Sequence, residues 1–482
     1  MTRSIRRVAG VLLVLLAALL VNLTVIQVFL ARDYRDRPGN QRVLLEEYDR
    51  QRGPILVGTQ AIARSVRTDG DLRYLRRYSD GELYASITGF YSLVYGATGL
   101  ERTENSVLSG SSDLFVVDRI EQLIAGRRPQ GGGVTTTLDA DAQLAAYVGL
   151  AGLQGAAVAI EPTTGRILAS VQSPSFDPNA LSSHDPASIR ATYDRLLNDP
   201  AQPMLNRPIV ALNPPGSTFK LVTTAAALAS GRYTPDSLLP GPATYRLPGS
   251  TKELRNWTGK ACGPDGKVTL RDALAMSCNT AFAWLGNQLG ADALREQADR
   301  FGFDTNIDIP LRAAASRFPE APDEAQTAMS AIGQFDVRAT ALQMAMVAAG
   351  IANQGRVMRP YLVQEIRAPD LTIVKTTEPS LLTTAMEAQA ASVLIDMMVN
   401  AVDNGTGTNG RIPGVKVAGK TGTGQTGGDR PAVAWFVALA PADAPRIAVA
   451  VVVEDAGTPE VSGNQLAAPI ARAIIEAVLP RG

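Results

Sequence analysis

The sequence predicts an α+β fold for the larger part of the chain, and two hairpin patterns carry this prediction. Residues 155–171 form two apolar runs about a Pro-Thr-Thr-Gly turn, which is typical of a hairpin with buried strands. Residues 432–453 repeat the pattern around a Pro-Ala-Asp-Ala-Pro turn, and helix-like segments lie between the two hairpins. We therefore expect one sheet that both ends of a domain build together, with helices inserted between them.

Length and composition indicate several domains and no strong overall charge. The chain has 482 residues, 45% of them hydrophobic, so two or three domains with a sizeable core are expected. Its 46 basic and 46 acidic residues balance, which argues against a nucleic-acid partner. The single histidine, His184, lies in a loop-like stretch. Histidine metal sites and a Ser-His-Asp hydrolase site are therefore both disfavoured.

The N-terminus carries a candidate membrane span. Residues 8–30 are almost continuously apolar and long enough to cross a bilayer, and three arginines precede them. This pattern predicts a cytoplasmic tail at 1–7 and an extracytoplasmic position for the rest of the chain. A cleavable signal peptide is the alternative, but it would have a shorter apolar core and a small-x-small cleavage site, which residues 28–30 do not provide. We expect an uncleaved single-pass anchor.

Residues 31–133 are predicted to form a smaller, extended, non-catalytic module. This part mixes charged segments, short apolar patches and turns, and no cysteine or phosphate loop stands out in it. We expect a pedestal here that serves docking or dimerisation. The glycine run at 131–133 indicates a boundary, so the large domain is expected to cover 134–482.

A serine with a lysine three positions later opens a predicted helix at 217–230. Two prolines and a glycine precede it, Ser217 is expected at the N-cap, and Gly231 supplies the C-terminal stop. Ser217 and Lys220 would then lie one turn apart on one face, where the amine can take the hydroxyl proton as the oxygen attacks a carbonyl. A capping serine followed by a surface lysine gives the same pattern, so this motif alone is not specific.

Ser277 and Asn279 form a second candidate motif, in the joint between predicted helices at 269–276 and 280–289. Alternate residues in a short joint project to one side, so both side chains are expected to face Ser217, as proton relay and amide binder. Polar residues that cap helices would give the same pattern.

Lys420, Thr421, Gly422 and Thr423 form the third motif, after a strand-like run. A cation at a strand end can hold a substrate carboxylate, and the missing side chain of Gly422 lets the backbone approach closely. The N–H of Thr423 can then point at a developing oxyanion. A turn with a solvated lysine is the alternative.

The same stretch also matches the Walker A pattern, at residues 414–421. A phosphate loop needs a strand before its first glycine and a helix that starts at its lysine. Here the interior Val-Lys-Val-Ala is itself strand-like, and the glycines and the proline within 422–431 disfavour a helix. We therefore expect neither nucleotide nor nucleic-acid binding.

In this order and spacing the three motifs resemble those of the penicillin-binding proteins, and the resemblance covers roughly residues 40–480. Further similar segments lie at 137–143, 161–165, 174–179, 206–207, 332–334 and 352–355. Residues 52–55 and 99–101 are similar to the N-terminal motifs of the class B, monofunctional members. Two departures are Glu161, where aspartate is commoner, and Phe335, where glycine is usual.

The resemblance implies a serine penicillin-recognising transpeptidase domain, with a five-stranded antiparallel sheet flanked by helices and a helical subdomain. It implies a D,D-transpeptidase that cross-links peptidoglycan stem peptides ending in D-Ala-D-Ala and that β-lactams acylate. No metal or organic cofactor is implied. The implied roles are Ser217 as nucleophile, Lys220 as base, Ser277 as proton carrier, Asn279 as amide binder, Lys420, Thr421, Gly422 and Thr423 as the carboxylate site, and the N–H groups of Ser217 and Thr423 as the oxyanion hole.

The same motifs leave two alternatives open. A hydrolase, either a D,D-carboxypeptidase or a β-lactamase, would use the same groups without a good acceptor groove. A catalytically idle scaffold of the division machinery would need none of them, although every motif residue is present. The resemblance also implies a SEDS-type glycan polymerase and other division or elongation proteins as partners.

Cys262 and Cys278 are the only two cysteines, 16 residues apart, and the anchor would expose them to an oxidising compartment. Cys278 is the middle residue of the second motif and should point away from the pocket if Ser277 and Asn279 point in. A disulfide would fasten residues 251–268 beside the site. Two buried thiols remain the alternative.

Overall fold

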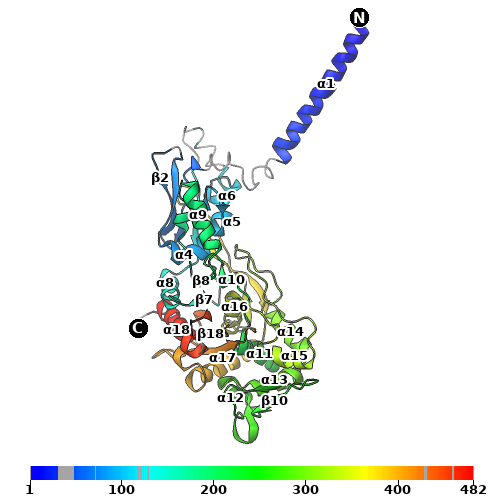
Figure 1. Ribbon diagram of the computed structural model, residues 1–482, viewed down its shortest axis with the longest axis vertical. Coiled ribbons are helices and arrows are strands. Elements are labelled where there is room, and N and C mark those ends of the chain that lie inside the picture. Colours follow the sequence, from blue (N-terminus) through cyan, green and yellow to red (C-terminus); the bar gives the residue numbers. More distant parts are fainter. Residues whose placement is uncertain are drawn as a thin grey trace.

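The computed structural model describes residues 2–30, 48–70, 72–116, 122, 124, 126, 130–427, 431–458 and 461–480. Figure 1 shows the helix α1 (Thr2–Thr24) extending away from the rest of the chain, a smaller module beside its base, and a larger domain beyond that module. The α1 helix continues as one π-turn, η1 (Val25–Phe29).

The predicted membrane span coincides with this helix. The stretch Ile5–Phe29 is long and apolar enough to cross a membrane, and none of it is buried within the protein. A helix that is hydrophobic all round needs an apolar environment. The N-terminal helix therefore fits a single-pass membrane anchor. The first part of the module predicted at 31–133, residues 31–47, lies outside the described residues.

The larger domain is built on a five-stranded antiparallel sheet, which confirms the predicted α+β fold. Its strand order is β17 (Ala418–Gly424), β18 (Val433–Ala440), β19 (Ile447–Asp455), β7 (Gln154–Ile160) and β8 (Ile167–Ser173). Both predicted hairpins are present, as β7–β8 and β18–β19. Strand β19 pairs with β7, so both ends of the domain meet in the middle of the sheet.

Alternate residues of these strands enter two separate cores, as the period of a strand requires. Trp435 and Val437 of β18 belong to the core that contains α16 (Ala341–Ala352). Phe436 belongs to the opposite core, which α8 (Ala140–Gly149) and α18 (Ala468–Val478) cover. All twelve residues of α16 are buried, so this helix lies fully within the domain.

The predicted helical segments are present, and several more helices accompany them. The predicted ones are α11 (Lys220–Ala229), α12 (Leu270–Ala275), α13 (Asn279–Leu289), α16, α17 (Ala388–Asp403) and α18. The additional helices are α8, α9 (Pro186–Leu197), α10 (Arg207–Val210), α14 (Ala291–Arg300) and α15 (Glu324–Ser330). Helix α9 fully buries only Ile189, although Tyr193 and Leu196 also pack against a small separate core.

Short strands and a disulfide complete the helical part of the larger domain. The strand pairs are β9 (Leu238–Pro240) with β12 (Lys267–Thr269), β10 (Thr244–Arg246) with β11 (Glu253–Arg255), and β13 (Arg356–Met358) with β16 (Leu381–Thr384). Cys262 and Cys278 form a disulfide with their Cα atoms 6.2 Å apart. It ties the loop after β11 to the joint between α12 and α13.

The smaller module is built on a six-stranded sheet to which distant parts of the chain contribute. Its strand order is β15 (Ile373–Thr376), β14 (Val363–Arg367), β6 (Gly133–Thr136), β1 (Ile55–Val57), β2 (Gln60–Arg67) and β3 (Tyr74–Tyr78). Both β14 and β15 lie far beyond the predicted boundary at residue 133. The larger domain thus supplies one edge of the sheet in the smaller module.

The remaining elements of the smaller module are short. They are α4 (Gly81–Thr88), β4 (Tyr91–Ser92), β5 (Gly96–Ala97), α5 (Gly99–Thr103), α6 (Asn105–Leu108) and η2 (Asp113–Phe115). Helix α4 joins the two parts of the protein, because Asn206 Nδ2 donates to the carbonyl oxygen of Ser86 at 2.6 Å and Ser86 Oγ donates to that of Ser170 at 2.9 Å.

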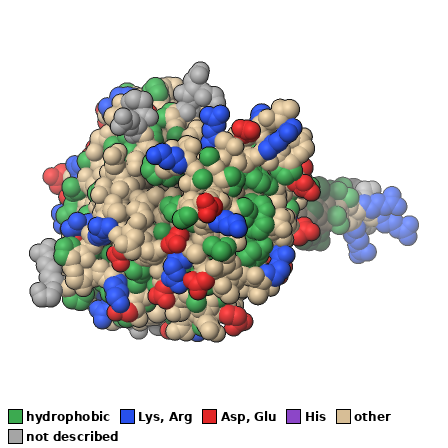
Figure 2. Space-filling model, turned by 90° about the horizontal axis from the view of Figure 1, so that it is seen from below, with side chains coloured by type: hydrophobic (Ala, Val, Ile, Leu, Met, Phe, Trp, Pro, Cys, Tyr) green, Lys and Arg blue, Asp and Glu red, His purple; other side chains and the backbone are tan. Residues whose placement is uncertain are grey.

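Figure 2 shows the face of the molecule seen from below the view of Figure 1. Basic and acidic side chains are interspersed there with hydrophobic ones, and neither sign dominates the face. This distribution agrees with the balance of 46 basic and 46 acidic residues.

Glu101, in the first turn of α5, is fully buried between two arginines. Its carboxylate accepts from Arg52 Nε and from Arg76 Nε, each at 2.6 Å. Arg52 also donates to Asn105 Oδ1 at 2.6 Å, and Arg76 to the carbonyl oxygen of Gly53 at 2.8 Å. Burial alone would raise the pKa of Glu101, but the two guanidinium groups outweigh it and the pKa lies below its usual value. The two N-terminal motifs therefore meet in one ion cluster.

We predict that Glu101→Gln destabilises the protein by about 3–5 kcal/mol, because two buried guanidinium groups then lose their counter-charge. The pKa of Glu101 is lowered in the folded state. The carboxylate therefore contributes to the free energy of unfolding above the ordinary pKa of 4.5, and this contribution is lost as the pH falls through the lower pKa of the folded state. Urea unfolding of both proteins at neutral and acidic pH measures this. The two unfolding free energies should converge at low pH.

The exposed pair Glu296–Arg300 offers a matched control, since its side chains are 66% and 49% exposed. Glu296→Gln should change the unfolding free energy by less than about 0.5 kcal/mol. If Glu101→Gln had as small an effect, the cluster would have no structural role. The same large difference from wild type at every pH would show that the charge of Glu101 is not the cause.

Candidate active site

Ser217 lies in a short 3-10 turn, η4 (Gly216–Phe219), that leads directly into α11. The expected N-cap position of Ser217 is wrong, because Pro215 precedes the turn as its N-cap and α11 begins at Lys220. Residues three apart in a 3-10 turn lie above one another, so the serine and the lysine still share a face. Ser217 is half-buried and Lys220 is fully buried.

The segment before Ser217 is held by contacts to three other parts of the domain. Asn213 exchanges both backbone hydrogen bonds with Ala339, at 3.0 and 2.8 Å. Trp435 Nε1 donates to the carbonyl oxygen of Pro214 at 3.0 Å, and the N–H of Gly216 donates to that of Gly333 at 2.9 Å. The position of the serine is therefore fixed from the sheet and from the loop that precedes α16.

Two glycines allow β17 to touch this turn backbone to backbone. Gly216 has a φ of 52°, and a Cβ there would lie 2.3 Å from the carbonyl oxygen of Thr423. A Cβ on Gly422 would lie 2.8 Å from the carbonyl oxygen of Pro215. Larger residues would push the strand away from the serine, so this close approach explains both glycines.

The amine of Lys220 joins the first motif to the second. Its Nζ donates to Asn279 Oδ1 at 2.7 Å, to the carbonyl oxygen of Ser277 at 2.8 Å and to Ser277 Oγ at 3.2 Å. Within the described chain, no group forms a hydrogen bond with Ser217 Oγ. Contacts between a nucleophile and its base are often long in unliganded sites. The structure thus brings Lys220, Ser277 and Asn279 together, one turn from Ser217.

The joint that carries Ser277 has an unusual backbone. Ser277 is buried and has a φ of 59°, which a non-glycine residue adopts at a cost. The next residue, Cys278, turns to the disulfide with Cys262. Asn279 Nδ2 donates to the carbonyl oxygen of Arg255 at 3.2 Å. Ser277 and Asn279 therefore face Lys220 while Cys278 faces away.

Lys420 lies within β17, at the edge of the five-stranded sheet. It is fully buried, and its Nζ donates to the carbonyl oxygen of Thr421 at 2.9 Å. A phosphate loop would place this lysine at the start of a helix. The Walker A match at 414–421 therefore has a strand where that helix would have to be.

Burial and like charge act on the two lysines. Burial lowers the pKa of Lys220 well below its usual value, and the charge of Lys420 lowers it further. Burial also lowers the pKa of Lys420, to about 7. Near neutral pH, Lys220 is therefore suited to accept a proton, and Lys420 gains its charge most easily when a carboxylate pairs with it.

Two residues near the site were not singled out from the sequence. Thr406 Oγ1 lies 2.6 Å from Thr421 Oγ1, and the N–H of Thr406 donates to the carbonyl oxygen of Ala275 at 3.0 Å. Thr406 thus connects the end of α12 to the third motif. The sequence carries no local signal for this contact, which joins residues 15 positions apart.

Gln334 is the second such residue. Its Nε2 donates to the carbonyl oxygen of Thr423 at 3.2 Å, and its Oε1 accepts from the N–H of Gln425 at 3.3 Å. Gln334 therefore fastens the turn at 333–335 to the end of β17. The sequence offered only the similarity of 332–334 to the family, without a contact.

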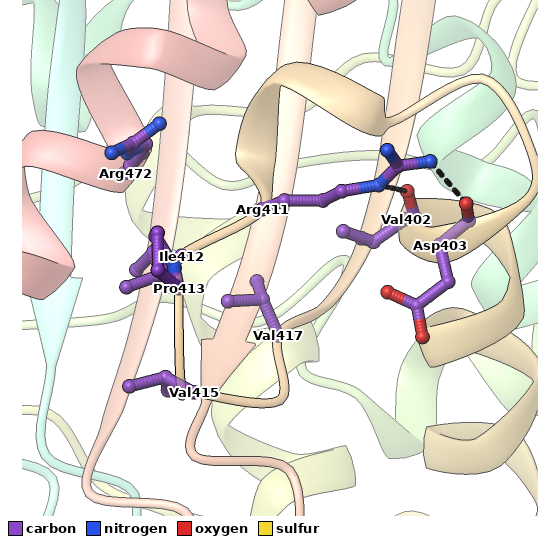
Figure 3. Close-up of a pocket in the computed structure, with 8 residues that line it drawn as sticks. All are labelled: Val402, Asp403, Arg411, Ile412, Pro413, Val415, Val417 and Arg472. Carbon is purple, nitrogen blue, oxygen red and sulfur yellow. Dashed lines mark hydrogen bonds between the residues drawn. The ribbon is translucent and has the colours of Figure 1, made fainter.

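A separate hollow of about 370 Å³ lies at the entry to β17, and Figure 3 shows its lining. Arg411 donates to the carbonyl oxygens of Val402 and Asp403, so its charge stabilises the C-terminal end of α17. No residue of the three motifs lines this hollow. The lining residues are Val402, Asp403, Arg411, Ile412, Pro413, Val415, Val417 and Arg472.

Family models match both parts of the chain. The penicillin binding protein transpeptidase domain matches residues 155–476, which is most of the larger domain. The penicillin binding protein A dimerisation domain matches residues 52–134 in the smaller module.

Full-length relatives support the same assignment. The chain is 48% identical to the peptidoglycan D,D-transpeptidase PbpA of Mycolicibacterium smegmatis, with 100% of both chains covered. It is 47% identical to PbpA of Mycobacterium tuberculosis, with 99% of both chains covered. The compact length and the Ala-, Arg- and Gly-rich composition predict penicillin-binding protein A of actinobacteria within the family, and these relatives confirm that prediction.

Solved structures agree with the fold. The ceftriaxone acyl-enzyme complex of penicillin-binding protein A from M. tuberculosis has a TM-score of 0.88 at 47% identity, over 90% of this chain and 100% of that one. The penicillin G acyl-enzyme complex has a TM-score of 0.85 at 46% identity, over 89% of this chain and 100% of that one. This chain therefore belongs to the class B penicillin-binding proteins, with a transpeptidase domain and a dimerisation domain of the penicillin-binding protein A type.

Proposed function

We propose that this chain is a peptidoglycan D,D-transpeptidase that works through a serine acyl-enzyme. The observation that carries the proposal is the buried amine of Lys220, which has a lowered pKa and lies one turn from Ser217. A buried amine of this kind is a base for the serine hydroxyl. Support also comes from the full-length relatives that carry this activity in their names.

Acylation follows from the positions of these groups. Ser217 Oγ attacks the carbonyl of the penultimate D-alanine, and its proton passes to Lys220 Nζ. The N–H groups of Ser217 and Thr423 stabilise the oxyanion. When the C–N bond breaks, Ser277 passes a proton to the leaving nitrogen and D-alanine departs. Lys220 Nζ and Ser277 Oγ are 3.2 Å apart, so the proton can travel between them.

Deacylation reverses the roles of the same groups. An amine of a neighbouring stem peptide attacks the ester and loses a proton to Lys220. The oxygen of Ser217 leaves and is protonated again, and the new amide bond is the cross-link. Attack by water in place of the amine would give hydrolysis, so the acceptor decides between transpeptidase and carboxypeptidase.

The free edge of β17 orients the donor peptide. Lys420, Thr421 and Thr423 bind its terminal carboxylate, Gly422 keeps the strand close, and Asn279 binds the donor amide. The reacting carbonyl lies between Ser217 and Thr423. The rest of the donor then extends past Thr423 towards the end of β17, as an added strand would.

The N-terminal helix would hold the larger domain outside the cytoplasm, where peptidoglycan is assembled. The arginines before the helix favour this orientation, because basic residues remain on the cytoplasmic side. A SEDS-type glycan polymerase and other division or elongation proteins are the proposed partners, since a transpeptidase needs a supply of uncross-linked glycan.

The function is tested with a fluorescent penicillin and with peptide substrates. Wild type should be labelled covalently, and Ser217→Ala should not be labelled. Ser230→Ala, at the C-cap of α11, should be labelled normally and serves as the control. A stem pentapeptide with an acceptor amine should give a cross-linked product and free D-alanine. A product that is only hydrolysed would support a carboxypeptidase, and the absence of labelling would contradict the proposal.

The two lysines should respond differently to arginine. Lys220→Arg should reduce acylation by about 10²–10⁴-fold, because guanidinium cannot accept the serine proton. Lys420→Arg should be milder, since that position needs a cation and not a base. Acylation by fluorescent penicillin measures both in folded protein. Equal losses would contradict the assignment of Lys220 as the base.

The pH profile separates the two roles further. Acylation by wild type should rise with pH while Lys220 loses its proton, and should fall above about pH 7, where unpaired Lys420 loses its charge. Lys420→Arg should flatten this alkaline fall, because arginine stays charged.

Membrane orientation is tested on intact spheroplasts. An external protease should digest the bulk of the chain and leave the N-terminal helix. Protection of residues 48–480 would place the domain in the cytoplasm and contradict the proposed orientation. If the domain lies outside, disruption of the membrane with detergent should make no difference to its digestion.

A further inference from the structure

Phe335 has a strained backbone that its packing does not explain. Among the described residues, Phe335 and Leu371 are the two large apolar residues with positive φ, at 59° and 71°. Bulky side chains are disfavoured in this region because the Cβ crowds the backbone. Phe335 is 45% exposed, so burial of its ring offsets little of this cost. Strain of this kind concentrates at functional sites.

The turn that carries Phe335 is fastened beside the candidate active site. Gln334 contacts the carbonyl oxygen of Thr423 and the N–H of Gln425, at 3.2 and 3.3 Å. Gly333 accepts from the N–H of Gly216 at 2.9 Å, one residue before the serine. The backbone before Phe335 is therefore attached to both the nucleophile turn and the end of β17.

The backbone after Phe335 is held as well. The carbonyl oxygen of Phe335 accepts from Arg338 Nη1 at 3.0 Å, and Asp336 pairs with Arg317 at 2.9 Å. Contacts on both sides keep the residue at its positive φ. The backbone at Phe335 is thus held near the far end of β17, and the residue is 45% exposed.

We propose that Phe335 is a specificity-determining residue, whose ring forms an apolar wall for the part of the acyl donor that precedes the penultimate D-alanine. The inference rests on the proposed function, which sets the direction of the donor along β17. With the carboxylate at Lys420 and the reacting carbonyl at Thr423, the preceding residue of the donor lies towards Gln425. Gln334 contacts that same position, and Phe335 is its neighbour.

The class of ligand follows from the chemistry of the ring. An aromatic side chain offers a large apolar surface with little conformational freedom to lose. It would contact the aliphatic side chain of the third stem residue, or the acyl side chain of a β-lactam. Ligands without a group at this position would not use the wall.

The test compares two β-lactams on the full-length protein. Penicillin G has a benzyl side chain, whereas imipenem has a small hydroxyethyl group. Phe335→Gly and Phe335→Ala should lower the second-order acylation rate constant for penicillin G by about three- to tenfold. The rate constant for imipenem should fall by less than about twofold. Phe335→Tyr keeps the ring and should retain the wild-type ratio.

Thermal stability gives an independent readout. Glycine adopts positive φ without a Cβ, so Phe335→Gly should melt about 1–3 °C above Phe335→Ala. Leu371 is the matched control, because it also has positive φ, is 48% exposed, and lies in the turn between β14 and β15. Leu371→Gly should likewise melt above Leu371→Ala, with unchanged acylation by both β-lactams.

The possible results separate the inference from the proposed function. If wild type reacts with both β-lactams and Phe335→Gly keeps the same ratio of rate constants, the inference is overturned. An equal loss for both β-lactams would also overturn it, because the residue would then support the site generally. If wild type reacts with neither β-lactam, the proposed function itself fails.

Discussion

A buried amine without a carboxylate partner is the constraint on which the larger domain depends. Lys220 Nζ lies within hydrogen-bond distance of three oxygens on the turn of Ser277 and Asn279, and none of them carries a full negative charge. A charged amine is costly in such a place, so the protein favours its neutral form. The same burial that makes Lys220 a base requires α11 to run through the centre of the domain and the second motif to close over it.

The five-stranded sheet also helps to position Ser217. Strand β17 can approach the serine only because Gly216 and Gly422 lack side chains at the contact, and Trp435 of the neighbouring strand holds the backbone of Pro214. Since β17 is an edge strand, its outer side remains open to an extended peptide. Strand β14 pairs with β6 in the sheet of the smaller module, so this sheet links the smaller module to the catalytic domain.

The sequence predicted the features that depend on local pattern. Both hairpins, most of the central helices and the three motifs follow from periodicity and turn residues. The N-cap position of Ser217 could not be predicted correctly, because a 3-10 turn and an α-helix begin with similar residues. Thr406 and the strand pairing of β14 with β6 depend on contacts between segments more than 10 residues apart, for which the sequence carries no local signal.

Two residues near the site break local backbone preference, and they differ in how the strain is compensated. Ser277 adopts positive φ but gains hydrogen bonds from Lys220, and the disulfide of Cys278 fixes the turn. Phe335 adopts positive φ and is 45% exposed. A glycine there would remove the backbone strain. The proposed contact with a bound ligand would compensate this strain.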